Sequence, residues 1–365
     1  MMIRDTQLYL LKNKLGEVLE SPYFSKSLIL YLEKLKIIVD KIINADHIDL
    51  PENIIDYCIQ SIFTATRFFT GSTTKKVPYE IVYCLEQACL DWTKNKSIIT
   101  TELSQNILSF YFIGVHQNFY ILANSIFGVD FDSELVQICL PDLYRRRPLY
   151  ATPLYHELGH FVDVNQAIVE QTFLKKDIHF NLPNLHLVPE LSGSSKDHNL
   201  LFQIQKSHRM EYFADLFSAK YIGRSGVEFL NEIAGEDPPS KTHPSTQDRI
   251  KVVDDFLNGI QNDIIDMFNT VLKSNNLPLL QYTTTNMDIS RSFNNIRPYE
   301  IKNKDELHAF IGESWIFLRE MFHEPKDKWA YIPKVQIEKS VNDLVEKSLR
   351  NHMIIKKWDN DGAAI

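Results

Sequence analysis

Two histidines that can bind one metal ion stand four residues apart in the segment 155–161, Tyr-His-Glu-Leu-Gly-His-Phe. Residues i and i+4 of an α-helix lie on the same face, so His156 and His160 can reach a common ion. Glu157 is rotated by about 100° from His156, which places its carboxylate beside that ion. The spacing therefore predicts a metal site at which an acid can take a proton from water.

The competing interpretation is a pair of solvated histidines on an exposed helix. The neighbouring side chains argue against it, because they are mostly apolar: Leu154, Tyr155, Leu158, Phe161 and Val162. Buried charged groups must be paired or bound to a metal, so burial of this helix favours the metal site. Gly159 also indicates close backbone approach, since a glycine within a helix costs about 1 kcal/mol relative to Ala.

A second stretch, residues 211–215, carries two acids at helical spacing. Glu211 and Asp215 are again i and i+4, and the small residues Ala214 and Ser218 border their face. A catalytic zinc takes three protein ligands, and two His with one Glu is a known set, so Glu211 is the expected third ligand. Asp215 is expected behind it, accepting the free ring N–H of a zinc-bound histidine. The alternative is a solvated acidic pair.

A third stretch, residues 242–250, begins a helix. Ser245 and Asp248 have the spacing of a capping pair. One long helix is expected to follow, with these apolar residues inside: Val253, Phe256, Ile260, Ile264, Met267 and Val271. Capping does not account for His243 or Arg249. A histidine in a loop beside zinc can donate a hydrogen bond to the oxyanion of a tetrahedral intermediate.

Other candidate ligands are weaker. An extended zinc pattern would need Gly three residues and His six residues after His160, where the chain has Asp163 and Gln166. Asp163 is not assigned as a ligand. Four further histidines have no helical spacing to one another and are expected at the surface: His179, His186, His198 and His208.

In their order, these three stretches resemble the gluzincin metallopeptidases, and most of all the CAAX prenyl protease and HtpX-like family. The resemblance covers roughly residues 135 to 255 and implies a zincin-like metallopeptidase core. It implies that one zinc ion per chain is bound by His156, His160 and Glu211 and that Glu157 is the general base. It also implies that His243 and Arg249 help to stabilise the transition state or its surroundings.

The expected function is a zinc-dependent endopeptidase that hydrolyses peptide bonds of a protein or peptide substrate. The chain departs from the membrane-bound members because it shows no transmembrane segment, so prenylated or membrane-embedded substrates are not implied. The alternative is a non-catalytic regulatory or partner-binding protein with a structural zinc site. Glu157 argues against it, since a structural site needs no base and usually closes all four positions with protein ligands.

The fold is expected to be mainly α with a small β-sheet. Residues 1–100 should form a helical subdomain, in which Leu28, Leu32, Leu35, Val39 and Ile42 make one apolar stripe. Residues 101–275 should form the metallopeptidase core, and residues 276–365 a C-terminal helical segment. The apolar runs 110–115 and 135–140 are β-prone, and at least one is expected as a strand next to the zinc helix.

Residues 165–205 are expected to form a loop insertion in the core. Loops of this length are usually functional or disordered. This one has apolar residues that can grip a surface, Phe180, Leu182, Leu185, Leu187 and Leu191, and a possible hinge at residues 193–195. A lid over the cleft and a tolerated surface insertion are both compatible with it.

Composition places the chain among ordinary globular proteins. It has 365 residues, 44% of them hydrophobic, with 39 basic and 47 acidic residues and a net charge of −8. The only basic cluster, residues 145–147, does not favour a nucleic-acid partner. Four cysteines, Cys58, Cys84, Cys89 and Cys139, lack metal-site spacing and are expected as free thiols in a reducing compartment.

No apolar run predicts membrane insertion. The N-terminus lacks the core of a signal peptide, and the most apolar long segment, residues 109–129, is interrupted at residues 116–118. A cytoplasmic protein is expected. A regulatory protein partner could bind through the helical N-terminal segment.

Overall fold

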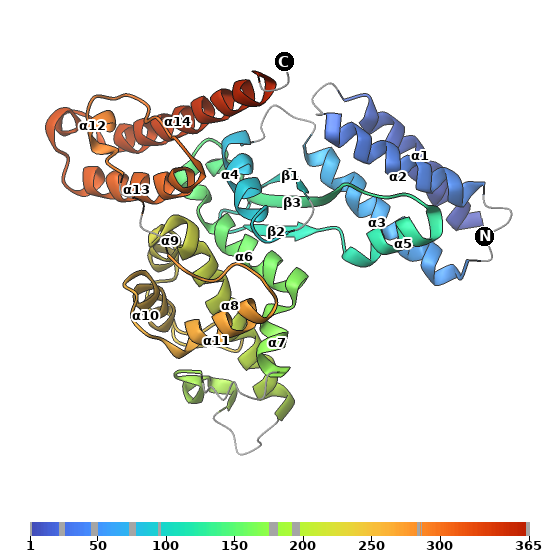
Figure 1. Ribbon diagram of the computed structural model, residues 1–365, viewed down its shortest axis with the longest axis horizontal. Helices are drawn as coiled ribbons and strands as arrows, with labels where there is room; N and C mark the ends of the chain where they lie inside the picture. The colour runs from blue at the N-terminus through green and yellow to red at the C-terminus, as the bar shows by residue number, and fades with distance from the viewer. Residues whose placement is uncertain are drawn as a thin grey trace. The chain divides into compact units, whose positions relative to one another are not determined.

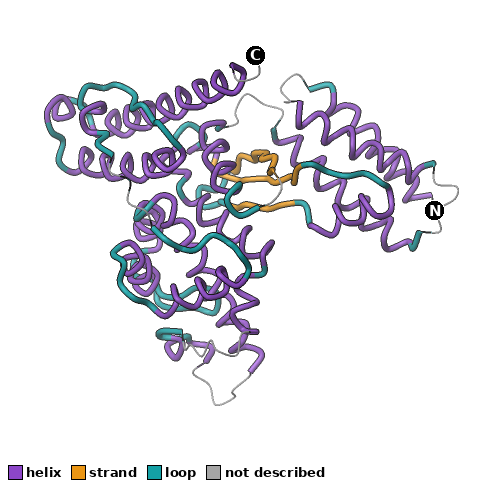
Figure 2. The backbone as a smooth tube through the Cα atoms, viewed as in Figure 1, coloured by secondary structure: helices purple, strands orange, loops and turns teal. Residues whose placement is uncertain are grey.

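The computed structural model describes residues 2–21, 26–44, 50–72, 78–93, 96–174, 182–191, 198–282, 285 and 287–362. The chain is mainly helical with one small sheet (Figures 1 and 2), as expected from the sequence. It divides into two compact units. Unit 1 contains Met1–Pro78 and Thr93–Arg145, and unit 2 contains Tyr79–Trp92 and Arg146–Ile365. The expected ranges 1–100, 101–275 and 276–365 cut across these units.

Unit 1 is a group of helices with a three-stranded sheet. Its elements are α1 (Met2–Leu19), α2 (Lys26–Ile43), α3 (Glu52–Gly71), β1 (Lys96–Ser104), β2 (Tyr111–Gly114), α5 (Gln117–Phe127), β3 (Ser133–Pro141) and the short 3-10 helix η1 (Asp142–Tyr144). The strand order is β1-β3-β2, with β1 parallel and β2 antiparallel to β3. Strands β2 and β3 confirm the two β-prone runs, whereas β1 was not expected.

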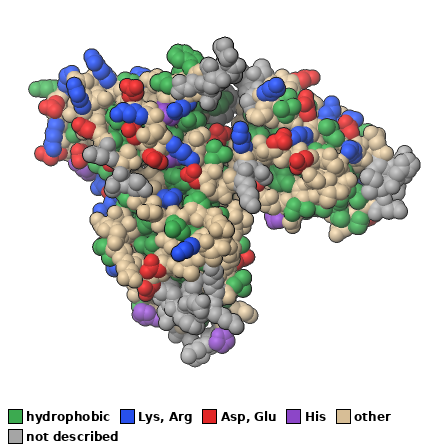
Figure 3. All heavy atoms as spheres, viewed as in Figure 1, with side chains coloured by type: hydrophobic (Ala, Val, Ile, Leu, Met, Phe, Trp, Pro, Cys, Tyr) green, Lys and Arg blue, Asp and Glu red, His purple; other side chains and the backbone are tan. Residues whose placement is uncertain are grey.

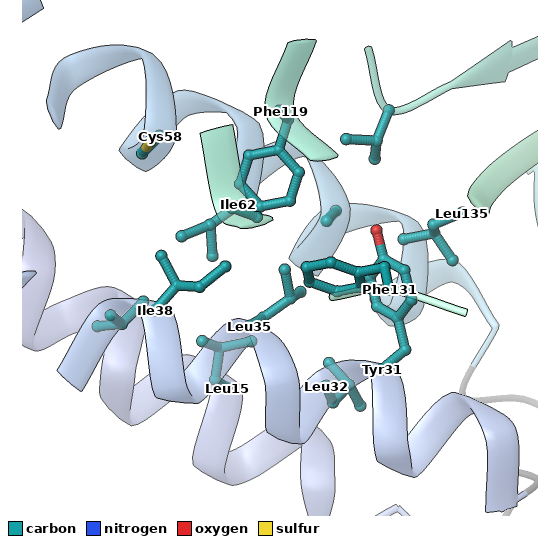
Figure 4. Packing of buried hydrophobic residues seen from close by; sticks show 14 of the residues in the cluster. Leu15, Tyr31, Leu32, Leu35, Ile38, Cys58, Ile62, Phe119, Phe131 and Leu135 are labelled. Atoms are coloured by element: carbon teal, nitrogen blue, oxygen red, sulfur yellow. The ribbon is translucent and has the colours of Figure 1, made fainter. Parts of the chain in front are cut away.

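The core of unit 1 joins the helices to the sheet. Leu32, Leu35 and Val39, from the expected apolar stripe of α2, are fully buried. Figure 4 shows Leu35 among Ile62 from α3, Phe119 from α5 and Phe131. Because β3 lies between β1 and β2, its side chains are buried along most of its length. The site helix belongs to unit 2, so its expected position next to a strand stays a prediction.

Unit 2 consists of helices. They are α4 (Tyr79–Cys89), η2 (Pro148–Ala151), α6 (Pro153–Gln166), α7 (Ile168–Leu174), η3 (Leu185–Leu187), η4 (Pro189–Leu191), α8 (His198–Ile222), α9 (Ser225–Ala234), α10 (Thr246–Leu257), α11 (Asp263–Ser274), α12 (Ser290–Phe293), α13 (Lys304–His323), η5 (Asp327–Tyr331) and α14 (Lys334–Gly362). The expected helices of the C-terminal segment are present as α13 and α14. Acidic and basic side chains lie side by side on these two helices in Figure 3.

The prediction of a single long helix after Ser245 is wrong. The structure has two helices, α10 and α11, and the chain turns between them at Gly259, whose φ is +65°. This left-handed conformation favours glycine and ends the helical path. Ile260, expected on the inside, is consequently 55% exposed. Asn262 then caps α11 by accepting the amide N–H of Ile264.

The expected loop 165–205 is more ordered than its composition indicated. It contains α7, and α8 begins at His198 rather than near Lys206. The part at residues 182–191 is anchored, because Val188 is fully buried and the Asn184 side chain donates to both carboxylate oxygens of Asp248, at 2.9 and 3.0 Å. The apolar residue Phe180 and the hinge at 193–195 lie outside the described residues.

Two further expectations concern thiols and membranes. All four cysteines are buried free thiols, as expected. Within the described part of the chain, no helix has both the length and the apolarity that a membrane span requires.

Candidate metal centre

The two histidines lie on α6 with the geometry that their spacing predicted. Pro153 begins this helix, where its missing N–H costs no hydrogen bond. The His156 and His160 rings lie 4.6 Å apart between centroids and are nearly perpendicular. Both side chains are mostly buried. Helix α6 therefore presents two imidazoles to one point.

Helix α8 supplies the carboxylate. Nε2 of His156 lies 3.4 Å from Oε2 of Glu211, and Nε2 of His160 lies 3.4 Å from Oε1 of the same side chain. One ligand atom from each of the three residues lies within 4.8 Å of the other two. Three residues from two helices thus form a group that could hold a metal ion, and the donor set of two imidazoles and one carboxylate fits zinc.

Gly159 allows the two helices to approach. A Cβ at this position would lie 2.7 Å from Cα of Ala214 and 3.1 Å from Cβ of Phe217. Because the nearest atom belongs to the backbone of α8, a side chain could be accommodated only by moving the helices apart. The glycine therefore sets the distance between the histidines on α6 and Glu211 on α8.

Replacing Gly159 by Ala is expected to destabilise the fold by about 1–3 kcal/mol, the usual cost of overpacking, and to weaken metal binding. Urea unfolding followed by circular dichroism and a zinc titration measure the two effects. Gly16→Ala is the matched control, since a Cβ there meets nothing within 4 Å and should stabilise α1 by about 0.5–1 kcal/mol. Unchanged stability and zinc affinity for Gly159→Ala would contradict the spacing role.

Asp215 and Arg249 lie behind the ligand group. Nδ1 of His156 is 2.9 Å from Oδ1 of Asp215. Arg249 donates from Nε to Oδ2 of Asp215 at 2.7 Å and from Nη2 to Oδ1 at 2.8 Å, and its Nη2 is also 3.2 Å from Oε2 of Glu211. The Arg249 and Asp215 side chains are only 7% and 6% exposed. Arg249 therefore contacts the carboxylates from the protein interior.

Electrostatics keeps both carboxylates ionised. Burial opposes ionisation of Asp215, but the charges and hydrogen bonds of Arg249 and His156 together outweigh it and lower the Asp215 pKa. Burial likewise opposes ionisation of Glu211, and its contacts with His156 and His160 hold its pKa well below the usual range. Burial lowers the pKa of His156, but Asp215 and Glu211 outweigh it and raise the pKa to about 10. Protons therefore compete with a metal cation for this group.

Glu157 is half-buried and follows His156 directly in the chain, and it is not one of the three residues of the group that could hold a metal ion. Burial raises its pKa, while the charges of His156 and His160 act in the opposite direction. The raised pKa makes its carboxylate a stronger base than a solvated glutamate.

His243 lies on the open side of the group. Its Nε2 is 3.6 Å from Oε1 of Glu211, and its Nδ1 is 2.8 Å from Oγ1 of Thr242. The side chain is 55% exposed. Ser245 caps α10 as expected, accepting the amide N–H of Asp248 at 3.1 Å. The short segment from His243 to Arg249 therefore contacts the group from two sides, one exposed and one buried.

The remaining candidates have other surroundings. Asp163 is buried and accepts the amide N–H of Val169 at 2.7 Å, so it caps the start of α7, and burial raises its pKa to about 6. His186 and His198 are exposed, as expected, and His179 lies outside the described residues. The expectation of a surface position is wrong for His208, which is only 1% exposed. The sequence offered one sign of this burial: His208 stands three residues before Glu211, so the two side chains share a helical face.

Comparison with known proteins identifies no relative: no protein-family model, no curated protein and no solved structure matches the chain. The resemblance to gluzincins rests on the three motifs alone and stays a prediction.

Proposed function

We propose that this chain is a zinc-dependent endopeptidase with a zincin-like core. The observation that carries the proposal is the convergence of His156, His160 and Glu211 with Glu157 beside them. Three protein ligands leave one position of a tetrahedral zinc free for water or substrate, as in catalytic sites. A zinc ion held there would lower the pKa of water to about 7 and polarise the scissile carbonyl.

Four other residues have separate roles in the proposed reaction. Glu157 accepts a proton from the attacking water and passes it to the leaving amine. His243 is exposed enough to meet a substrate, and its Nε2–H can donate to the developing oxyanion. Asp215 orients the His156 ring from its Nδ1 side, and Arg249 holds Asp215 and Glu211 in place. Arg249 thus acts through the carboxylates rather than on substrate.

Metal content tests the proposal directly. Purified protein is expected to contain one zinc ion per chain by elemental analysis and to hydrolyse a labelled unfolded protein until a zinc chelator is added. His156→Ala should lose the zinc, because it removes one of the three ligands. His323→Ala, at the exposed end of α13, is the control and should retain it. Wild-type protein without zinc, or His156→Ala with full zinc content, would overturn the assignment.

A further inference from the structure

The segment that carries His243 is a tight turn, residues 240–243. The amide of Ser240 donates to the carbonyl oxygen of His243 at 2.9 Å, and the amide of His243 donates to Oγ of Ser240 at 3.1 Å. The amide of Thr242 donates to the same Oγ at 3.3 Å. These bonds give the turn its shape, but they do not attach it to the rest of unit 2.

His208 attaches this turn to α8. Its ring is buried, and its Nε2 lies 2.8 Å from the carbonyl oxygen of Ser240. A carbonyl oxygen only accepts hydrogen bonds, so Nε2 must carry the proton and donate. Nδ1 of His208 is buried without a hydrogen-bond partner in the described part of the chain. The contact to Ser240 is therefore the ring's hydrogen bond.

The same helix supplies the carboxylate that His243 approaches. His208 and Glu211 are i and i+3 on α8, so they share a face. Oε1 of Glu211 lies 3.6 Å from Nε2 of His243, while Nε2 of His208 holds the other end of the turn. Helix α8 thus positions both Ser240, through His208, and the proposed metal ligand Glu211.

We infer that His208 is a positioning residue that holds the 240–243 turn so that His243 stays beside the metal ligand Glu211. This inference rests on the proposed function for its effect on catalysis. An exposed loop side chain has no packing of its own to fix it, and a displacement of about 1 Å at a reacting group costs on the order of 100-fold in rate. Buried Pro239 and Pro244 hold the two ends of the segment, and the hydrogen bond from α8 adds a constraint within the turn itself.

A double-mutant cycle tests the inference with zinc-loaded protein and a labelled unfolded protein as substrate. His208→Leu is expected to lower kcat by up to about 100-fold, with little change in KM and with zinc still at one per chain. In a His243→Ala background, His208→Leu should cause no further loss, because its effect passes through His243. His208→Gln, whose side-chain amide can donate to Ser240, should recover part of the rate. Equal losses with and without His243 would overturn the inference.

A second readout does not depend on catalysis. Lys241 is exposed within the turn, so release of the turn should speed tryptic cleavage there, followed by mass spectrometry. His208→Leu is expected to accelerate this cleavage and His208→Gln to restore the slow rate. His352→Leu is the matched control, since His352 is also buried and its Nδ1 lies 2.9 Å from the carbonyl oxygen of Ile301. It should leave cleavage at Lys241 unchanged.

The two readouts separate the inference from the proposed function. If zinc-loaded wild-type protein hydrolyses nothing, the proposed function fails, while faster cleavage at Lys241 in His208→Leu still supports the anchoring. Unchanged cleavage at Lys241 in His208→Leu overturns the anchoring whatever the activity.

Discussion

Glu157→Gln is expected to abolish peptide hydrolysis while one zinc ion per chain stays bound. The amide has nearly the shape of the carboxylate but cannot accept the proton of the attacking water, and loss of a general base lowers rates by a factor on the order of 10²–10⁴. Glu157 is not one of the three grouped ligand residues, so metal affinity should change little. Hydrolysis of a labelled protein substrate and elemental analysis measure both properties.

The same variant distinguishes the enzyme from a regulatory protein with a structural zinc site. Glu170→Gln is the matched control, because Glu170 on α7 pairs with Lys206 at the surface and should have no role in hydrolysis. In cells, peptides that accumulate only with Glu157→Gln would identify substrates. A biological activity that survives Glu157→Gln intact would favour the structural alternative.

The sequence predicted the relative positions of site residues that lie on the same helix. His156, Glu157 and His160 take their relative positions from the helical repeat, so five residues of sequence suffice. Glu211 and Asp215 show their common face in the same way, but their approach to α6 depends on packing, and Gly159 gave only a hint of it. His208 was missed because its partner is a backbone carbonyl, which leaves no residue pattern of its own, and only the i, i+3 spacing to Glu211 pointed to its position.

The fold was predictable where apolar residues repeat along a helix, as in α2, α13 and α14. Strand β1 was missed because its first half lies in the range 1–100, which was expected to be helical, and its pairing with β3 joins residues that lie far apart in the chain. The break between α10 and α11 was missed because the apolar repeat continues across Gly259, whose backbone conformation overrides it. Unit membership depends on long-range packing as well, so α4 lies with unit 2 despite its place among the N-terminal helices.

Arg249→Leu is expected to destabilise unit 2 by about 3–5 kcal/mol in metal-free protein, because it removes the buried guanidinium that pairs with Asp215 and Glu211 and leaves histidines as the remaining partners of the two carboxylates. All four tryptophans, Trp92, Trp315, Trp329 and Trp358, belong to unit 2. Tryptophan fluorescence during urea unfolding therefore reports on this unit alone.

Arg350→Leu is the matched control for Arg249→Leu. Arg350 also contacts two carboxylates, Glu80 and Glu346, but its side chain is 54% exposed, so its loss should cost no more than about 1 kcal/mol. Adding Asp215→Asn to Arg249→Leu should restore part of the lost stability, since the double variant removes one buried charge together with its partner. Equal costs for the two arginine variants would show that burial does not amplify the Arg249 contacts. A large cost for Arg249→Leu, partly relieved by Asp215→Asn, would show that Arg249 serves the site by holding its carboxylates charged and in place.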